Sequence, residues 1–504
     1  MPVRWPLVRG RRVTQFGVEM PVKSNRQAVQ LSLCIAVFLV PFMGSSLNLA
    51  MPMIADNFEM SAFFQTFLVS SYLLGTAMFQ MPAARLGDLF GRRRLFLLGL
   101  STFGLFTFLS GVSWSGWSLV AFRFASGVGS AMVFATNMAI LTAVFPKEER
   151  GKALGVNTAV VYLAVAIGPT LGGLFAQHLG WRSIFYVCFA LSVVAVLAAV
   201  GSIKDEWAEA AGEPLDVKGS VAYAIAVGGV VCGFTFLPHT VGWVLLVLGV
   251  GAAAVFVKFE HIVRFPMVRL ELFFNNRHFR LSSLSAMINY SASFAIGFTM
   301  SLYLQFVKGM PADSAGFLLM AQPAAQTLLS PLAGRLSDKT NPSCLTTSGM
   351  AAIALGLLAL STLRRDTPVW LVVAILVLVG VGVALFSSPN VNIIMGSVSS
   401  RDSGVASATT GTARQIGQAL SMSMTSLIVH AYMGEHKLTP QTADMFLPAM
   451  NTAFLIFVGI SCVGIYTSAS KLFGDGKGKN DWRYVSARFI RKEDKGGKRQ
   501  SGRQ

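Results

Sequence analysis

The sequence predicts an all-α integral membrane protein with fourteen transmembrane helices, arranged as two six-helix bundles plus an inserted two-helix hairpin. Three observations predict this fold class: the composition, a series of long apolar segments, and a charged loop that occurs twice. The chain has 504 residues, of which 53% are hydrophobic and only 13% are charged. Soluble domains carry about 25% charged residues, so we expect most of this chain to lie within a bilayer.

Long apolar segments recur from the first tenth of the chain almost to its end. Each is long enough to cross a hydrocarbon core about 30 Å thick as a helix. We predict spans over residues 29–54, 62–84, 95–112, 117–145, 153–177, 183–203, 219–238, 241–258, 281–307, 315–334, 344–363, 369–396, 404–432 and 447–470.

The charged loop at 84–94 lies between the second and third spans and contains Asp88 and several arginines. A weaker copy at 334–339, with Asp338, lies between the tenth and eleventh spans. The repeat implies a duplicated fold, and duplicated halves around a central site are the usual plan of a secondary transporter. Six spans with short loops need roughly 200 residues. The larger interval between the two copies leaves room for the helix pair at 219–258.

The repeat and the spans together divide the chain into segments. We expect a basic cytoplasmic tail at 1–28, a six-helix bundle at 29–203, cytoplasmic linkers within 204–280 that flank the inserted pair 219–258, a second six-helix bundle at 281–470, and a basic cytoplasmic tail at 471–504.

The net charge of +18 is distributed unevenly over the two sides of the predicted bilayer. Most of the 41 Lys and Arg residues lie in the two tails and in the loops that follow even-numbered spans. By the positive-inside rule, this bias predicts that both termini are cytoplasmic. The basic tail is expected to contact anionic lipid rather than nucleic acid. The opposite side holds only Arg182, Lys308, Arg364, Arg365 and Lys437.

Several other classes of protein are excluded by what the sequence lacks. The first apolar run is too long for the core of a cleavable signal peptide. The 5 cysteines are scattered without ligand spacing, so neither a metal site nor a disulfide framework is expected. No phosphate-binding loop for ATP occurs, and no nucleophile–base pair or paired carboxylates suggest an enzyme. No cofactor is expected.

The charged loop resembles the signature loop of the major facilitator superfamily, Gly-x-Leu-x-Asp-Arg-x-Gly-Arg-Arg. It departs from that pattern at Ala84 and Leu89. The resemblance implies the major facilitator fold, in which this loop latches the two halves in one of their alternating states. The residues that would form the latch here are Asp88, Gly91, Arg92, Arg93 and, in the second copy, Asp338.

Arg123 lies within the fourth span, in a stretch that resembles the family motif Arg-x-x-Gln-Gly-x-Gly with Ser126 in place of Gln. A guanidinium in the hydrocarbon region is costly unless it faces a partner inside the bundle. The resemblance implies that Arg123 assists proton movement. The alternative from the sequence is an interfacial arginine whose side chain extends outward to water.

The fifth span contains Gly168-Pro169-x-x-Gly172-Gly173, which matches the antiporter motif Gly-Pro-x-x-Gly-Gly. Proline removes a backbone hydrogen bond, and the glycines allow a neighbouring helix to approach closely, so the motif is typical of a kinked pivot. The resemblance implies an exporter of the antiport type.

Other stretches resemble the fourteen-span drug:proton antiporter family, so the resemblance covers nearly the whole chain outside its tails. It implies proton-coupled multidrug efflux across the cell inner membrane. The stretches are 48–54, 180–185, 303–305, 386–390 and 413–417.

Two departures from that family concern charge and polarity. Met43 stands where family members carry Asp, and 188–190 replaces an expected Asn-x-Pro. None of the predicted span interiors contains Asp or Glu. A buried carboxylate is the natural proton carrier and cation ligand in such exporters, so its absence argues against proton coupling and a preference for cations. The expected substrate-cavity residues are Asn48, Asn289, Gln305, Asn390, Arg414 and Gln415.

The sequence therefore predicts a secondary active transporter that exports small amphipathic compounds by alternating access, with protons as the coupling ion. One alternative is a symporter or facilitator of an organic anion or neutral metabolite, which Arg123, Arg414 and the missing carboxylates favour. More remote alternatives are a non-transporting membrane sensor and a lipid-modifying membrane enzyme. The expected partners are a small-molecule substrate, protons and the lipid bilayer, without nucleic acid or ATP. Whether a periplasmic adaptor takes part stays open.

Overall fold

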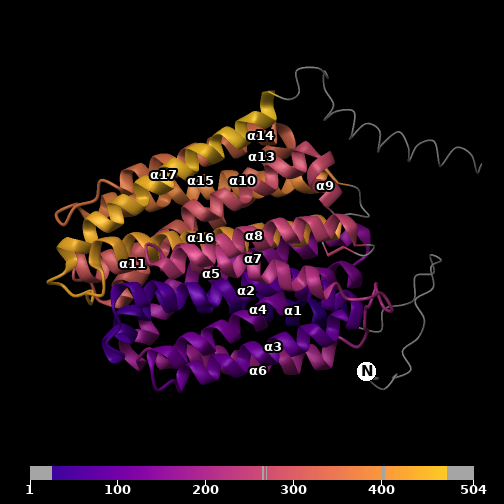
Figure 1. Cartoon of the computed structure of the whole chain (residues 1–504), viewed down its shortest axis with the longest axis horizontal. Helices are drawn as coiled ribbons and strands as arrows, with labels where there is room; N and C mark the ends of the chain where they lie inside the picture. Colours follow the sequence, from indigo (N-terminus) through magenta and orange to yellow (C-terminus); the bar gives the residue numbers. More distant parts are fainter. Residues whose placement is uncertain (1–24, 264–265, 268–269, 399–402, 474–504) are drawn as a thin grey trace, which may run out of the picture.

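The computed structural model describes residues 25–263, 266–267, 270–398 and 403–473, and every element within them is helical (Figure 1). The predicted tails therefore lie largely outside the described residues. The first set of helices is α1 (Arg26–Asn57), α2 (Ala62–Phe90), α3 (Arg92–Gly111), α4 (Gly116–Val144), α5 (Lys147–Leu179) and α6 (Arg182–Ser202).

The remaining elements begin with the inserted pair, α7 and α8, in the middle of the chain. They are α7 (Val217–Phe236), α8 (Thr240–Ile262), α9 (Leu270–Asn275), α10 (Arg277–Ser293), α11 (Ala295–Leu302), the π-helix η1 (Tyr303–Val307), α12 (Ala312–Leu319), α13 (Ala321–Lys339), α14 (Pro342–Leu360), α15 (Val369–Gly396), α16 (Ser403–Met433) and α17 (Ala443–Phe473).

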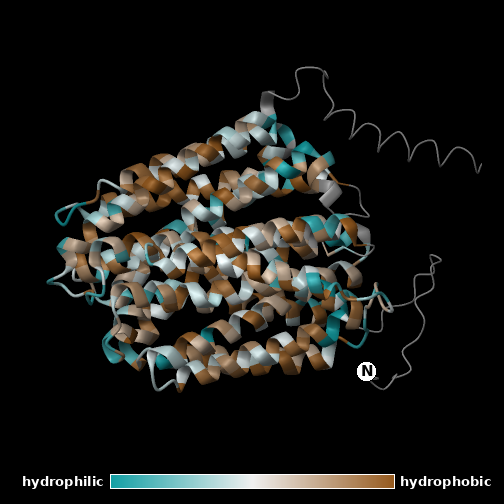
Figure 2. Ribbon diagram, in the orientation of Figure 1, coloured by the Kyte–Doolittle hydropathy of each residue, from teal (hydrophilic) through white to brown (hydrophobic). Residues whose placement is uncertain are grey.

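Within the described residues, 11 helices are long and apolar enough to cross a membrane: α1 to α8, α14, α15 and α17. Their apolar surfaces run along the middle of the molecule, with hydrophilic residues concentrated toward the helix ends (Figure 2). The multi-pass character predicted from the sequence is thus supported. The other predicted spans coincide with α10 to η1, with α12 and α13, and with α16. The structure divides the first two of these spans into shorter helices, because α10, α11, η1 and α12 have 17, 8, 5 and 8 residues. The helices α13 and α16 carry amide and arginine side chains that line an internal cavity.

The helices pack as two sets, with α7 in contact with both and α8 packed against α7 (Figure 1). In the first set, α2 and α3 pack on α4, and α1 packs on α5 and α6. In the second set, α14 packs on α15 and α17, and α10 packs on α16 and α17. Contacts between the sets join α2 to α16 and α5 to α12 and α13. The fold is therefore two helical bundles facing each other.

The two helices of the inserted pair differ in how they contact the rest of the molecule. In α7, the Tyr223 hydroxyl donates to the carbonyl of Ala77 on α2 at 2.9 Å, and the Thr235 hydroxyl donates to the Ser423 hydroxyl on α16 at 3.0 Å. Thus α7 is hydrogen-bonded to both sets. In α8, by contrast, the buried residues are only Gly242, Gly249 and Glu260. Its remaining surface faces outward, where lipid would cover it.

The predicted loop at 84–94 is a tight corner between two helices. The α2 helix continues through Asp88 to Phe90, and α3 begins at Arg92, so Gly91 alone is non-helical. Gly91 has a φ of +114°, a conformation that residues with a side chain rarely adopt. We refer to the end of the molecule that carries this corner as the Asp88 end; α1 begins and α17 ends there (Figure 1).

Candidate functional site

A cavity of about 230 Å³ lies between the two sets of helices. Its wall comes from α1, α2, α4 and α5 on one side and from α10 to α13, α15 and α16 on the other. Within the described part of the chain, the wall includes two arginines but neither Asp nor Glu. Its aromatic residues are Tyr72, Phe134, Tyr162, Tyr290 and Phe294, and its amide and arginine residues are Asn48, Arg123, Gln322, Gln326, Arg414, Gln415 and Gln418.

Arg123 lies on this wall with only 1% of its surface exposed. Its guanidinium carbon is 4.3 Å from the centroid of the Tyr72 ring, in a cation–π contact. The Tyr72 hydroxyl donates to the Ser130 hydroxyl at 2.8 Å, which fixes the ring. Arg123 Nε and Nη1 are buried and have no hydrogen-bond partner in the described structure. The side chain therefore points inward, and the interfacial alternative from the sequence is wrong.

Arg414 lies on the opposite side of the same cavity, on α16. Its guanidinium carbon is 5.3 Å from the centroid of the Phe134 ring on α4. Phe134 follows Arg123 by about three helical turns, so both residues face the same direction and lie roughly 16 Å apart along α4. The two guanidinium groups thus come from different sets of helices and lie at different depths.

Three of the six expected cavity residues lie on the wall and three do not. Asn48, Arg414 and Gln415 line the cavity. Asn289 is fully buried elsewhere on α10, and both polar atoms of its side chain lack a hydrogen-bond partner. Gln305 Nε2 donates to the Ser301 hydroxyl at 3.0 Å, and Asn390 Nδ2 donates to the Ser282 carbonyl at 3.1 Å.

Four aromatic residues of the wall were not expected from the sequence: Tyr72, Phe134, Tyr162 and Phe294. Tyr72 and Tyr162 lie in apolar runs, where an aromatic ring that faces a cavity cannot be told from one that faces a neighbouring helix. Met43, at the family's Asp position, is fully buried and accepts a weak hydrogen bond from the Thr107 hydroxyl at 3.6 Å. It does not line the cavity.

The Gly-Pro motif of α5 lies where three helices meet. The Ser46 hydroxyl on α1 donates to the Gly168 carbonyl at 2.9 Å. A Cβ at Gly172 would collide with the backbone of Ser46, and a Cβ at Gly173 would collide with the carbonyl of Ala312 on α12. Pro169 lines the cavity between them. Since α1 and α12 belong to different sets, the motif lies at the contact between the two sets.

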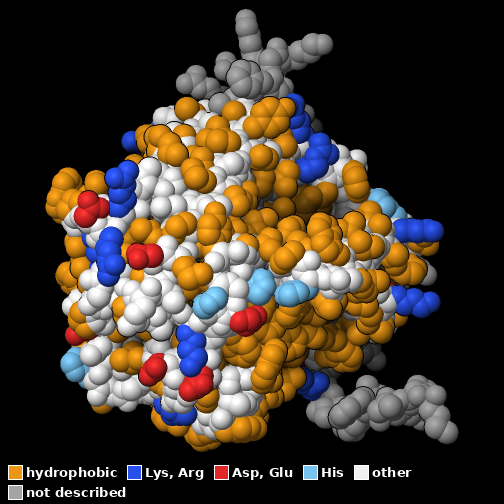
Figure 3. All heavy atoms as spheres, turned by 60° about the vertical axis from the view of Figure 1, so that its left-hand side comes forward, with side chains coloured by type: hydrophobic (Ala, Val, Ile, Leu, Met, Phe, Trp, Pro, Cys, Tyr) orange, Lys and Arg blue, Asp and Glu red, His pale blue; other side chains and the backbone are white. Residues whose placement is uncertain are grey.

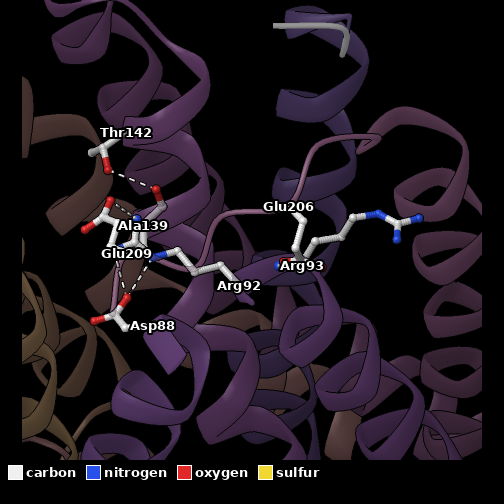
Figure 4. Close-up of polar contacts among 7 residues, drawn as sticks. All are labelled: Asp88, Arg92, Arg93, Ala139, Thr142, Glu206 and Glu209. Atoms are coloured by element: carbon white, nitrogen blue, oxygen red, sulfur yellow. Dashed lines mark hydrogen bonds and ion pairs between the residues drawn. The ribbon is translucent and has the colours of Figure 1, made fainter. Parts of the chain in front are cut away.

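The helix corner at the Asp88 end holds an ion-pair cluster (Figure 4). Asp88 Oδ1 accepts from Arg92 Nε at 2.9 Å and lies 2.8 Å from Arg92 Nη2. Arg92 Nη1 donates to Glu209 Oε1 at 2.7 Å, and Arg85 Nη2 donates to Glu213 Oε2 at 2.7 Å. Both glutamates belong to the segment 203–216, which joins α6 to α7. This linker is therefore bound directly to the corner.

A third glutamate of the linker contacts the start of α3. Glu206 Oε1 accepts from the backbone N–H of Arg93 at 2.9 Å, and Glu206 Oε2 is 3.6 Å from Arg94 Nε. Burial raises the pKa of the Glu206 carboxyl above its usual value. Two backbone hydrogen bonds complete the attachment, from Arg92 N–H to the Trp207 carbonyl at 2.8 Å and from Ala210 N–H to the Asp88 carbonyl at 2.9 Å.

In the part of the chain that the structure describes, Arg92 and Arg93 bind glutamates of the linker, and the Asp88 carboxylate pairs with Arg92. Asp88, Arg92 and Arg93 all contact 203–216. The spacing of Glu206, Glu209 and Glu213 is a sequence signal that could have predicted this attachment to the arginines of the corner. The backbone of Asp338 belongs to α13, whereas its side chain lies outside the described residues.

The two sets of helices are closed against each other at the end opposite Asp88. Lys437 Nζ pairs with Glu59 Oε2 at 3.3 Å, and the Thr66 hydroxyl donates to the Ser426 hydroxyl at 2.7 Å. The Ser301 hydroxyl donates to the Asn48 carbonyl at 2.8 Å. Charged side chains of both signs are mixed on this end, while hydrophobic side chains cover much of the adjoining flank (Figure 3). These contacts join the two sets of helices at the end opposite Asp88.

Comparison with known proteins agrees with this arrangement. The chain is 27% identical over 439 residues to the riboflavin transporter RibZ of Clostridioides difficile. The matched region covers 87% of this chain and 95% of that protein. It is 30% identical over 406 residues to the multidrug resistance protein Stp of Mycobacterium tuberculosis (79% and 75% covered). It is 28% identical over 413 residues to the tetracenomycin C resistance and export protein of Streptomyces glaucescens (80% and 76% covered).

The fold also matches a solved membrane transporter. A bacterial homologue of the human lysosomal transporter Spinster, in an inward-facing and unoccupied conformation, superposes with a TM-score of 0.65 at 16% identity, covering 88% of this chain and 96% of that one. A family model described as Major Facilitator Superfamily matches residues 33–422 and 282–476. These matches confirm the membership predicted from the motifs: the chain belongs to the major facilitator superfamily.

Proposed function

We propose that this protein is a secondary active transporter that exports small amphipathic compounds by alternating access. The observation that carries the proposal is the cavity between two sets of helices, which contact each other at the end opposite Asp88. Aromatic, amide and arginine side chains line this cavity. The Gly-Pro motif at the contact between the sets supports export. So do two relatives whose names denote multidrug resistance and tetracenomycin C export.

The proposed topology has fourteen spans in the cell inner membrane, with both termini in the cytoplasm. It counts α10 to η1, α12 with α13, and α16 as the three spans beyond the 11 most apolar helices. The basic residues at the Asp88 end favour a cytoplasmic position for that end. With this orientation, the structure is the state that is closed to the outside.

In the proposed cycle, the bundle at 29–203 rocks against the bundle at 281–470. The contacts of α7 with both bundles and the attachment of the 203–216 linker to the Asp88 corner support a role for the inserted pair in this motion. Opening the far end requires the pairs Lys437–Glu59 and Thr66–Ser426 to separate. The Asp88 corner then acts as the latch, with the linker glutamates as its partners in the present state.

Inward proton flow is the proposed driving force, with Arg123 as the coupling candidate. A second candidate function is a symporter or facilitator of an organic anion or neutral metabolite. The specific observation in its favour is the cavity wall itself, which holds two arginines and no carboxylate among the described residues. The relative named as a riboflavin transporter adds support for this alternative.

Efflux from cells that lack their own exporters tests the proposal. Expression of the parent chain should lower the accumulation of at least one amphipathic dye or antibiotic, and a protonophore should abolish the difference. The same assay with Gly172→Val, which obstructs the contact with α1, is the inactive control. Higher accumulation with the parent chain than with the control would contradict export and favour the uptake alternative.

A further inference from the structure

We infer that the cavity binds an organic anion with a flat aromatic body, and that Arg123 and Arg414 are its two charge-recognition points. This inference rests on the proposed function, because it assigns the substrate class of the same cavity. It follows from three independent features of the wall: an unpaired buried guanidinium, a second guanidinium from the other set of helices, and aromatic rings between them.

The first feature is the state of Arg123. Only 1% of its surface is exposed. Two of its three guanidinium nitrogens have no hydrogen-bond partner in the described structure. An arginine does not lose its charge in a protein. A buried charge without a counter-ion is strongly unfavourable unless another group compensates it. The ring of Tyr72 covers one face of the guanidinium, which leaves its edge for an anion.

The second feature is the position of Arg414. It lies nearer the Asp88 end than Arg123, because its contact with Phe134 is about three turns further along α4, roughly 16 Å. An anion that enters from the Asp88 end meets Arg414 first and Arg123 at greater depth. Since the two arginines belong to different sets of helices, an anion that passes between them interacts in turn with each moving half.

The third feature is what lies between the two charges. Tyr72, Tyr162 and Tyr290 line the cavity together with two phenylalanines. Aromatic rings stack favourably on flat ring systems and exclude water from them. A lipophilic cation would meet the same rings, but it would face two like charges and no opposite charge on the described wall. The combination therefore selects aromatic anions over aromatic cations.

Binding and transport of three flat tricyclic dyes test this inference: fluorescein as the anion, riboflavin as the neutral compound and rhodamine 6G as the cation. Binding is measured by fluorescence anisotropy with the purified full-length chain in detergent. Transport is measured in proteoliposomes with a proton gradient of either sign. The variants are Arg123→Gln and Arg414→Gln, with Arg365→Gln, an exposed arginine at the opposite end, as the matched control.

The parent should bind fluorescein at least tenfold more tightly than rhodamine 6G. Each cavity variant should lose tenfold or more of the fluorescein affinity and change the riboflavin affinity less than threefold, while Arg365→Gln changes neither. Because loss of a buried arginine can impair folding, Gln322→Glu provides a second test on the cavity wall, with Gln441→Glu on an exposed loop as its control. Gln322→Glu should weaken fluorescein binding and strengthen rhodamine 6G binding.

Equal or tighter binding of rhodamine 6G by the parent would overturn the inference. So would unchanged fluorescein affinity in both arginine variants, or no binding of any of the three dyes. Arginine-dependent fluorescein binding without transport would contradict the proposed transport function and leave the assigned ligand class standing. Transport of rhodamine 6G without transport of fluorescein would support the proposed transport function and contradict the assigned ligand class.

Discussion

At the scale of single residues, the glycines of α5 decide how closely the two sets of helices approach. Gly168 contacts Ser45 on α1, and Gly173 contacts Ala312 on α12, at distances that leave no room for a side chain. Gly155 lies on the same helix with nothing within 4 Å of its would-be Cβ. Packing against α1 and α12 therefore requires glycine at the motif, whereas Gly155 on the same helix has no neighbour that excludes a side chain.

We predict that Gly168→Val and Gly172→Val reduce transport by at least about tenfold, because the added side chains force α1 and α5 apart. Transport in proteoliposomes measures the effect, with the amount of folded protein checked by size-exclusion chromatography. Gly155→Val carries the same change into open space and should retain parental activity. Equal losses in all three variants would show that valine disturbs α5 as a helix rather than its contacts.

The proposed role of Asp88 depends on its contacts with the Arg92 guanidinium. We predict that Asp88→Asn lowers transport by about tenfold while expression stays near normal, because the amide accepts more weakly than a carboxylate from the Arg92 guanidinium. The measurement is substrate efflux normalised to the protein present in the membrane. Asp56→Asn, an exposed position at the opposite end, is the control. Unchanged efflux in Asp88→Asn would remove the latch role from the corner.

At the scale of elements, the 203–216 linker is the part of the structure that connects the inserted helix pair to the first bundle. Its three glutamates pair with the arginines of the corner in the reverse order along the chain: Glu206 with Arg94, Glu209 with Arg92, and Glu213 with Arg85. Isolated exposed ion pairs contribute little. Here Arg85 and Arg92 are largely buried, and backbone hydrogen bonds accompany the pairs, so the linker is held as a unit.

We predict that Glu213→Arg releases the linker and lowers transport by roughly threefold to tenfold, because two like charges then face each other at the corner. Hydrogen exchange of the 203–216 backbone should increase in parallel. Arg85→Glu combined with Glu213→Arg restores opposite charges in the same place and should return both quantities to within about twofold of the parent. A double variant no better than the single one would mean that the pair itself does not hold the linker.

At the scale of the whole molecule, the contacts between the two sets of helices define its state. The ion pair Lys437–Glu59 and the hydrogen bonds from Thr66 and Ser301 lie at the end away from the Asp88 corner. If the Asp88 end is cytoplasmic, the cavity should be reached by water from the cytoplasm in the absence of substrate. This access depends both on which end of the molecule faces the cytoplasm and on which end of the cavity is open.

We predict that a membrane-impermeant maleimide added to intact spheroplasts labels Gln441→Cys but not Thr340→Cys, each in a background without native cysteines. Gln441 lies on an exposed loop at the end opposite Asp88, whereas Thr340 is exposed at the Asp88 end. Thr340→Cys should react once the membrane is permeabilised. Labelling of Thr340→Cys from outside would reverse the proposed topology, and with it the direction in which the cavity opens.

The sequence by itself determined the family membership, the motifs and the presence of many apolar spans, of which 11 are long and apolar enough to cross a membrane in the described structure. Apolar length, charge bias and the spacing of glycines and prolines are local properties, so each can be read from one short segment. The structure extends α2 through Asp88 to a corner at Gly91, and it divides the predicted spans 281–307 and 315–334 into shorter helices.

Only the tertiary structure decided which side chains face the cavity and which segment holds the corner. Asn289 and Asn390 face neighbouring helices, while Tyr72 and Tyr162 face the cavity. The rotation of a helix about its own axis is set by packing against all of its neighbours, and a span that is apolar on every side carries no periodic signal for it. The sequence likewise could not show that Arg123 and Arg414 line one cavity, because they lie on two helices from different halves of the chain.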